Sequence, residues 1–400
     1  MFEKNSSGAG LNSSEGRGLD MCSYSIMLAS DSYKGSASSK EVEDYLETGI
    51  RRVLPNARIV KYPIADGGEG TIDALVSACN GVKREIEVSG PLGDPVKASY
   101  GILEGGTVIV EMAQASGITL VEQSSDNVLH CSTFGVGQII EDALDHGAKK
   151  IMVGLGGSAT SDGGVGMAKA LGVKFLDTTG QPTECGLIGL RDLKSIDCSG
   201  IDKRIYDTEI VALTDVSNPL TGENGAVYVY GPQKGIALDE LAMLDGWMKS
   251  YAFLLRNTVD SDVGNIAGAG AAGGLGVALV AFCGAKITPG IDAVLDAINL
   301  EDCMGEMDLV ITGEGRMDGQ SVNGKAPIGV ARRAQRHGVP VVAIVGSRAD
   351  DIDLVYDEGI GLVLSTINQA GSLKECFSRV GIDIPNAGET AIRAFLLGRR

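Results

Sequence analysis

Short apolar runs along the chain alternate with longer segments in which apolar residues recur every three or four positions. The short runs are typical of buried strands, and the longer spacing is typical of helices that bury one face. The runs predict strands at residues 25–30, 58–65, 150–155, 209–216, 308–312, 340–345 and 361–366. Strands that alternate with helices indicate a parallel sheet with helices on both faces.

Three helical segments are marked most clearly. Ser38 and Glu41 have the spacing of a capping box, which predicts that the first helix begins just after Ser38. Apolar residues recur at helical spacing from 238 to 255. Residues 272–284 are apolar almost all round, which indicates a buried helix.

The segment from residue 83 to 113 has a different pattern. Its short strand-like runs follow one another with only turn residues between them, at residues 84–88, 98–103 and 107–112. Because no helix intervenes, this segment is expected to be antiparallel. Regular strand–helix alternation returns after about residue 288.

These patterns, together with a length of 400 residues, predict two domains. We expect an α/β protein with a Rossmann-like parallel-sheet domain that is discontinuous in sequence, formed by residues 25–85 and 288–400. A second α/β domain, residues 86–287, is inserted in it, and the active site would lie in the cleft between them. Residues 1–24 are rich in Ser, Gly and Asn and predict a disordered tail.

The charge of the chain narrows the range of partners. The formal net charge is −18, which argues against binding to nucleic acid or to anionic membranes, so an anionic small molecule would have to be captured by local basic groups. The eight cysteines are scattered and form no Cys-x-x-Cys pair, which predicts reduced thiols and a cytoplasmic protein. No apolar run reaches the roughly 18 residues of a membrane helix.

The most informative segment is the run Gly154-Leu-Gly-Gly-Ser-Ala-Thr-Ser-Asp-Gly-Gly164, between an apolar run and a helical pattern. Glycines at such a turn leave backbone N–H groups and a helix N-terminus free to bind an anion, most often phosphate. The alternative is a tight turn with a helix cap. The residues predicted to bind phosphate here are Gly156, Gly157, Ser158, Ala159, Thr160, Asp162 and Gly163.

Two further loops follow predicted strands near the N-terminus. The run Asp31-Ser32-Tyr-Lys34-Gly-Ser offers Lys34 to a carboxylate or phosphate, although a surface lysine is the simpler interpretation. The run Asp66-Gly67-Gly68-Glu69-Gly70 places two carboxylates on a tight backbone. Metal binding or general-base catalysis fits that second loop, and a plain acidic turn fits about as well.

Two loops near later strands complete the set. Asp215 could bind Mg²⁺, which takes one or two carboxylates together with substrate phosphates. Arg316 offers a bidentate fork to a carboxylate or phosphate, and Asp318 lies two residues on. Lys325 closes a near-match to the phosphate-binding P-loop pattern, in which an alanine replaces the metal-binding hydroxyl, so only the lysine remains a candidate phosphate contact.

The run Gly268-Ala-Gly-Ala-Ala-Gly273 matches the dinucleotide-binding pattern. The residues before it do not read as a strand, so close helix packing is the simpler explanation. The histidines lie outside all of these loops and form no zinc-like cluster, so a general base would be Asp or Glu.

In this order, the loops resemble those of the bacterial-type glycerate kinase family, the glycerate 2-kinases of the glucarate and glyoxylate pathways. The resemblance extends from about Ser25 nearly to the C-terminus, and it includes Val110-Glu-Met-Ala-Gln-Ala-Ser-Gly117, Asp215-Val-Ser-Asn-Pro-Leu220 and Gly231-Pro-Gln-Lys-Gly235 besides the loops above. The chain departs from the family pattern at residues 127–133 and in the tail before Asp31.

The resemblance implies transfer of the ATP γ-phosphoryl group to a hydroxyl of D-glycerate, with Mg²⁺ as cofactor. The 2-hydroxyl is the expected acceptor and the 3-hydroxyl the alternative. An NAD(P)-linked dehydrogenase or a non-catalytic metabolite-binding protein would be the other classes. No nucleic-acid or membrane partner is expected.

Roles follow for the loops as hypotheses. Lys34 and Arg316 would bind the glycerate carboxylate and the incoming phosphoryl group, and Lys325 would assist the ATP phosphates. Asp66 and Asp215 would hold Mg²⁺ or orient the attacking hydroxyl, with Asp318 as a further candidate base. The residues expected around the substrate are Asp31, Ser32, Lys34, Gly67, Gly68, Glu69 and Arg316.

Overall fold

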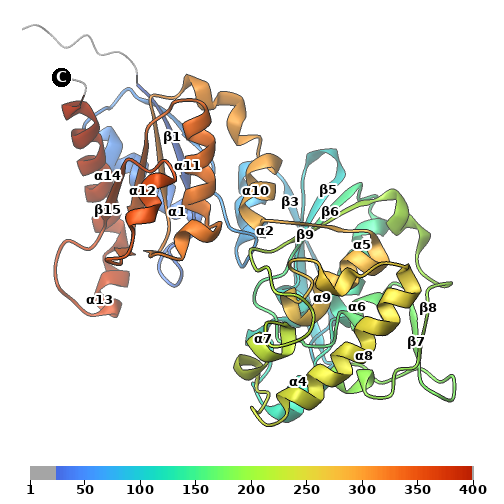
Figure 1. Ribbon diagram of the computed structural model, residues 1–400. Helices are drawn as coiled ribbons and strands as arrows, with labels where there is room; N and C mark the ends of the chain where they lie inside the picture. The colour runs from blue at the N-terminus through green and yellow to red at the C-terminus, as the bar shows by residue number, and fades with distance from the viewer. Residues whose placement is uncertain (1–23, 399–400) are drawn as a thin grey trace, which may run out of the picture.

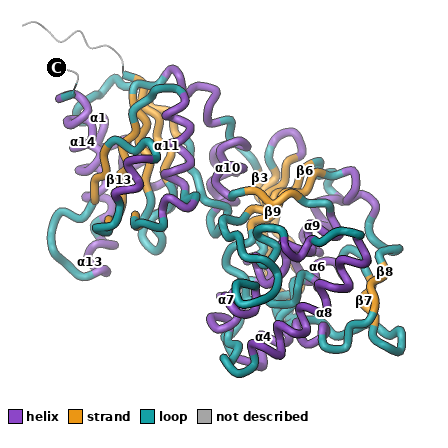
Figure 2. The backbone as a smooth tube through the Cα atoms, in the orientation of Figure 1, coloured by secondary structure: helices purple, strands orange, loops and turns teal. Residues whose placement is uncertain are grey.

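The structure, a computed structural model, describes residues 24–398, so the predicted tail lies outside the described residues apart from Tyr24. The chain forms two lobes, each built around its own β-sheet (Figure 1). Figure 2 shows the strands at the centre of each lobe with helices around them.

The first lobe contains a five-stranded sheet in the order β15-β13-β11-β1-β2, and every pair in it is parallel. Its strands are β1 (Ser25–Ser30), β2 (Arg58–Lys61), β11 (Leu309–Gly313), β13 (Val341–Val345) and β15 (Leu362–Ser365). Counted within this lobe, the order is 2-1-3-4-5, which is the doubly wound order of flavodoxin. The predicted parallel sheet, discontinuous in sequence, is therefore confirmed. It has five strands in this order and not the six strands of the Rossmann dinucleotide-binding fold.

Helices cover both faces of the first sheet because successive strand residues alternate between two cores. Ile26 and Leu28 of β1 face the core under α1 and α14, whereas Met27 faces the core under α11. The helices of this lobe are α1 (Ser39–Arg51), α11 (Ala326–Arg336), α12 (Asp353–Asp357), α13 (Leu373–Ser378) and α14 (Val380–Leu397). The predicted capping box at Ser38 and Glu41 is present at the start of α1.

The second lobe contains a six-stranded sheet in the order β10-β9-β6-β5-β4-β3. Its strands are β3 (Val82–Ser89), β4 (Pro95–Ile102), β5 (Thr107–Glu111), β6 (Lys150–Gly154), β9 (Glu209–Leu213) and β10 (Lys286–Thr288). The pairs β3–β4 and β4–β5 are antiparallel, as the segment from 83 to 113 predicted, and the other pairs are parallel. The proposed domain boundary at residue 85 falls inside β3, which lies wholly in this sheet.

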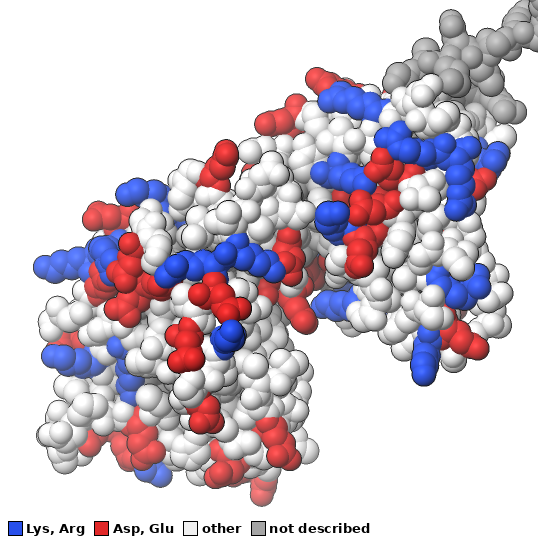
Figure 3. All heavy atoms as spheres, turned by 180° about the vertical axis from the view of Figure 1, so that it is seen from behind, with Lys and Arg blue, Asp and Glu red and all other residues white. Residues whose placement is uncertain are grey.

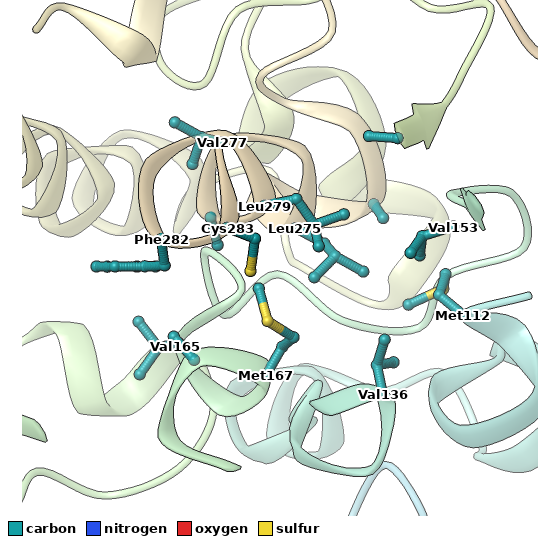
Figure 4. Close-up of a cluster of buried hydrophobic side chains, with 14 of the residues drawn as sticks. Met112, Val136, Val153, Val165, Met167, Leu275, Val277, Leu279, Phe282 and Cys283 are labelled. Carbon is teal, nitrogen blue, oxygen red and sulfur yellow. The ribbon is translucent and has the colours of Figure 1, made fainter. Parts of the chain in front are cut away.

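Helices of the second lobe pack on its sheet around a large apolar core. They are α3 (Ala113–Ser116), α4 (Ser125–His130), α5 (Phe134–Asp145), α6 (Val165–Ala170), α7 (Ala226–Lys234), α8 (Leu241–Val259) and α9 (Ala271–Cys283). Figure 4 shows part of this core, in which Leu275 and Leu279 of α9 face Met167 of α6. The buried helix predicted over residues 272–284 is thus present as α9.

Short elements complete both lobes. The strands β7 (Lys174–Leu176) and β8 (Ser195–Asp197) pair in the second lobe, and β12 (Arg316–Met317) pairs with β14 (Ser347–Arg348) in the first. The 3₁₀ helices span Glu104–Gly106, Ile118–Leu120, Leu187–Leu190, Lys203–Asp207, Val263–Asn265, Leu300–Glu306 and Ser321–Asn323.

Two helices join the lobes. The helices α2 (Thr71–Ala78) and α10 (Gly290–Ala297) lie between the sheets in Figure 1. Their apolar residues belong to one continuous core that also includes Val310 of the first sheet and Met152 of the second. Apolar packing, and not only the two chain crossings, therefore fixes the lobes next to each other.

The surface mixes charges of both signs. On the face seen in Figure 3, Lys and Arg side chains are interspersed with Asp and Glu over both lobes, although the net charge of the chain is −18. Within residues 24–398, no helix is long and apolar enough to cross a membrane.

Candidate active site

One pocket lies at the carboxyl edge of the first sheet. It has a volume of about 460 Å³ and is lined by loops that follow β1, β11, β13 and β15. The strands β1 and β11 are neighbours, and the chain proceeds from them in opposite directions across the sheet. Open α/β sheets bind ligands at such a switch point, because the two loops separate there and leave a crevice.

Several predicted residues line this first pocket from different loops, namely Asp31, Ser32, Lys34, Asp66, Arg316 and Lys325. The Arg316 side chain is 71% exposed, with its Nε 3.6 Å from Asp318. The Lys325 ammonium lies 3.1 Å from Glu314, which is buried, and 3.8 Å from Asp318. Both cations therefore line the pocket and are each paired with a neighbouring carboxylate.

A second pocket, of about 360 Å³, lies where the lobes meet. It is lined by glycine-rich segments from both lobes and by Asp215 at the end of β9. A Cβ atom at Gly154 would overlap the carbonyl oxygen of Gly67, and one at Gly290 would overlap that of Asp66. These glycines are required because the loop after β2 crosses to the second lobe and packs directly on its backbone. The predicted residues in this pocket are Lys34, Asp66, Gly67, Gly68, Glu69, Gly156, Gly157, Ser158 and Asp215.

The two pockets share Lys34 and Asp66. Lys34 is an exposed residue of the loop after β1, and Asp66 is half-buried in the loop that crosses between the lobes. A ligand in either pocket therefore reaches the same two charged groups.

Carboxylates concentrate around this junction. Burial, together with the nearby charge of Asp66, raises the pKa of Asp31 to about 7. Removal from water raises the pKa of Asp215 to about 6, although part of the residue still faces solvent, and Asp66 again contributes. A cation placed among these groups would relieve their mutual repulsion.

Asp66 and Asp215 fit a magnesium ion that takes one or two carboxylates and completes its shell with phosphate and water. The described residues contain no group of three or more His, Cys, Asp or Glu side chains that could hold a metal by themselves. Any magnesium bound here would consequently depend on a phosphate ligand.

The second half of the loop from 154 to 164 does not reach either pocket, contrary to the predicted phosphate site. Ala159, Thr160 and Asp162 are buried, and the Gly163 N–H donates to the Gly273 carbonyl. The Asp162 carboxylate accepts bonds of 2.9 and 3.0 Å from the N–H groups of Gly164 and Gly166 at the start of α6. The anion site predicted at this helix N-terminus is thus occupied by the loop's own carboxylate.

Lys234 is a site residue that the sequence prediction did not include. It is the last residue of α7, lines the second pocket, is 4% exposed, and donates to the Thr160 carbonyl at 2.5 Å. Burial lowers its pKa to about 8, and the charge of Asp162 opposes that shift. The Gly-Pro-Gln-Lys-Gly motif drew attention to this segment. The burial of the Lys234 side chain could not be predicted from it, because that burial depends on a contact with Thr160, which is distant in sequence.

Asp318 does not line either pocket, but pairs with Arg316 and Lys325 behind the first. Its carboxylate thus contacts two of the candidate cations, and its role as a base stays a prediction. Glu314 of the same loop lines the first pocket and accepts a 2.8 Å hydrogen bond from Ser321.

The dinucleotide-like run from 268 to 273 follows a 3₁₀ helix and not a strand. A Cβ at Gly273 would overlap the Thr160 carbonyl, so close packing explains this glycine. Ala272 beside it has a φ of 51°, a strained value for a residue with a side chain, and lines the second pocket.

The fold and the paired pockets define an α/β enzyme that gathers basic side chains and carboxylates at the carboxyl ends of parallel strands. The model of the glycerate kinase family matches residues 26–396, and the chain belongs to this family. The resemblance inferred from the loops is thereby confirmed.

Relatives cover nearly the whole chain. A "Glycerate 2-kinase" of Escherichia coli (strain K12) is 44% identical over 376 residues, which is 94% of this chain and 99% of the relative. A "Glycerate kinase" of Halalkalibacterium halodurans is 45% identical over 88% of this chain and 93% of its own. The crystal structure of a candidate glycerate kinase 2 from Salmonella typhimurium LT2 is 42% identical, with a TM-score of 0.86, over 94% of this chain and 99% of that one.

Proposed function

We propose that the protein transfers the γ-phosphoryl group of ATP to the 2-hydroxyl of D-glycerate, giving 2-phosphoglycerate and ADP. The family and the names of the relatives support glycerate phosphorylation, and the name of the Escherichia coli relative favours the 2-hydroxyl over the 3-hydroxyl. A 3-phosphoglycerate product is the second candidate.

The observation that most supports a transfer reaction is the meeting of two pockets at Lys34 and Asp66. Phosphoryl transfer requires a donor and an acceptor in line, with charge neutralised between them. Two adjoining pockets that share one cation and one carboxylate suit that requirement. A single binding protein for one metabolite needs no second pocket.

Lys34 and Arg316 would neutralise the oxygens of the transferring group, and Lys325 would bind the ATP phosphates. Asp66 would accept the proton of the glycerate hydroxyl as its oxygen bonds to the γ-phosphorus and the bond to the ADP oxygen breaks. Asp215 would hold a magnesium ion, which would supply positive charge to the phosphates, and this would leave Asp66 free to accept the proton. Lys234 would pair with the glycerate carboxylate in the second pocket.

The proposal is tested by incubating the protein with ATP, Mg²⁺ and D-glycerate and measuring ADP release. A parallel reaction contains enolase as the only coupling enzyme. ADP together with phosphoenolpyruvate identifies the 2-phosphate product, and ADP without phosphoenolpyruvate identifies the 3-phosphate. Absence of ADP release would contradict the proposal. The cytoplasmic location inferred from the scattered cysteines stays a prediction.

A further inference from the structure

One end of the first pocket is lined by large apolar side chains that are exposed. Ile367 is 45% exposed, Leu373 is 69% exposed and Phe377 is 37% exposed. Apolar side chains that gather in an exposed, concave place are typical of a ligand surface. Glycerate has no apolar part that would cover them, so its phosphorylation leaves this end of the pocket unexplained.

Two of these apolar side chains, Leu373 and Phe377, belong to the short helix α13, which lines the pocket. Ser372 and Glu375 form a capping box at the start of this helix, and none of its residues is buried. The Phe377 ring nevertheless packs against the loop after β1. A Cβ atom added at Gly35 would lie only 3.3 Å from Cε2 of Phe377. Gly35 follows Lys34, so the aromatic ring lies next to the loop that bears the shared cation.

Charged side chains line the same pocket. The basic residues Lys34, Arg316 and Lys325 line it, and so do the carboxylates of Asp31, Asp66, Glu314 and Asp383. The whole pocket measures about 460 Å³. That volume is in the range of about 300–1,000 Å³ found for pockets that hold drug-sized ligands. A ligand that suits this lining has both a flat apolar group and negative charges.

We propose that the nucleotide occupies this first pocket, with its purine ring against Phe377 and Leu373 and its phosphates toward Arg316 and Lys325. The location agrees with the switch point between β1 and β11, where doubly wound sheets bind ligands. The assignment rests on the proposed kinase function. It moves the ATP phosphates away from the loop at 156–163 and leaves the second pocket to glycerate.

With the nucleotide in the first pocket, the positions of both ligands along the cleft can be stated. The γ-phosphoryl group would point out of the first pocket at Lys34 and Asp66, which both pockets share. Glycerate in the second pocket would then approach it from the side of Lys234. The glycine-lined walls of that pocket would bring the backbone close to this small substrate.

The test measures binding of ADP and of inorganic tripolyphosphate to the full chain by calorimetry, without glycerate. Phe377→Ala should weaken ADP binding about tenfold, since stacking on an aromatic ring is worth about 1–3 kcal/mol per base. Tripolyphosphate, which has no base, should bind both proteins equally. Phe253→Ala serves as the matched control, because Phe253 is 66% exposed on α8 outside both pockets.

Equal weakening of ADP and tripolyphosphate would show that the ring only supports the phosphate loop, and this would overturn the assignment. Unchanged ADP binding in both Phe377→Ala and Leu373→Ala would overturn it as well. If the wild-type protein phosphorylates glycerate while these variants keep their ADP affinity, the assignment falls and the function stands. If ADP binding depends on Phe377 but no glycerate is phosphorylated, the function falls and the nucleotide site stands.

Discussion

The two pockets meet at the same two residues but have different walls. In the first, side chains from loops of one sheet provide apolar surface, cations and carboxylates. In the second, glycines of both lobes expose the backbone, and the ammonium of Lys234 lies buried at its margin. A pocket walled by side chains suits a large ligand with distinct ends, whereas one walled by backbone suits a small polar ligand held by short contacts.

The largest effect should come from the place where the pockets join. Lys34→Ala should lower kcat at least 100-fold, because removal of one group that stabilises transition-state charge costs about 10²–10³ in rate. Steady-state kinetics with both substrates would measure this. Lys40→Ala, which removes a lysine of α1 that is 65% exposed, is the control and should keep the wild-type rate. Near-normal turnover by Lys34→Ala would show that the pockets do not share a reaction.

A substitution confined to the second pocket should change the KM for D-glycerate much more than the KM for ATP. Lys234→Met keeps the apolar length of the side chain and removes its charge, so the KM for D-glycerate should rise about 10- to 100-fold. The KM for ATP should change less than about threefold. Lys174→Met on β7, where the side chain is 61% exposed and its partner Asp197 is 40% exposed, serves as the control. An equal rise in both KM values would mean that Lys234 supports the fold of the cleft and not one ligand.

The same lysine predicts a pH dependence. Burial lowers the pKa of Lys234 to about 8, so it is charged below that pH and neutral above it. The KM for D-glycerate should therefore rise as pH increases above about 8, by up to about tenfold per pH unit, and the rise should be absent in Lys234→Met. A flat profile up to pH 10 in the wild-type protein would contradict both the pKa and the role. Titration of free lysines would act only near pH 10.4.

Much of this arrangement could be predicted from the sequence. The strand–helix alternation predicted the parallel strands, and the run without helices predicted the antiparallel ones. Lys34 and Arg316 were placed in loops after predicted strands, and both line the first pocket, because strand ends in a parallel sheet share one edge. The order of the strands and the burial of Lys234 could not be predicted, since both depend on contacts between distant segments. The apolar face of α13 has no motif that marks it as a site.

The loop at 154–164 shows most clearly what a sequence pattern leaves open. Glycines after a strand do predict free N–H groups at the next helix, but only the folded chain shows what occupies them. Here the Oδ2 atom of Asp162 also accepts hydrogen bonds from Thr133, the residue that precedes α5. The Thr133 N–H donates at 2.9 Å and its hydroxyl at 2.8 Å. In this structure the turn's helix N-terminus is therefore bonded to Asp162, while Gly156, Gly157 and Ser158 line the second pocket and stay candidate phosphate contacts.

The smallest effect on catalysis is expected from Asp162→Asn, because the Asp162 carboxylate bonds to buried donors and lines neither pocket. An amide would turn an N–H group toward the buried donors that the carboxylate satisfies, and leaving them unpaired should cost about 3 kcal/mol of unfolding free energy. Urea unfolding would measure the loss, with Asp239→Asn on an exposed loop as the control that leaves stability unchanged. The folded fraction should keep both KM values within about twofold. Wild-type stability combined with weakened ATP binding would instead restore this loop as the phosphate site and undo the division of the cleft into two pockets.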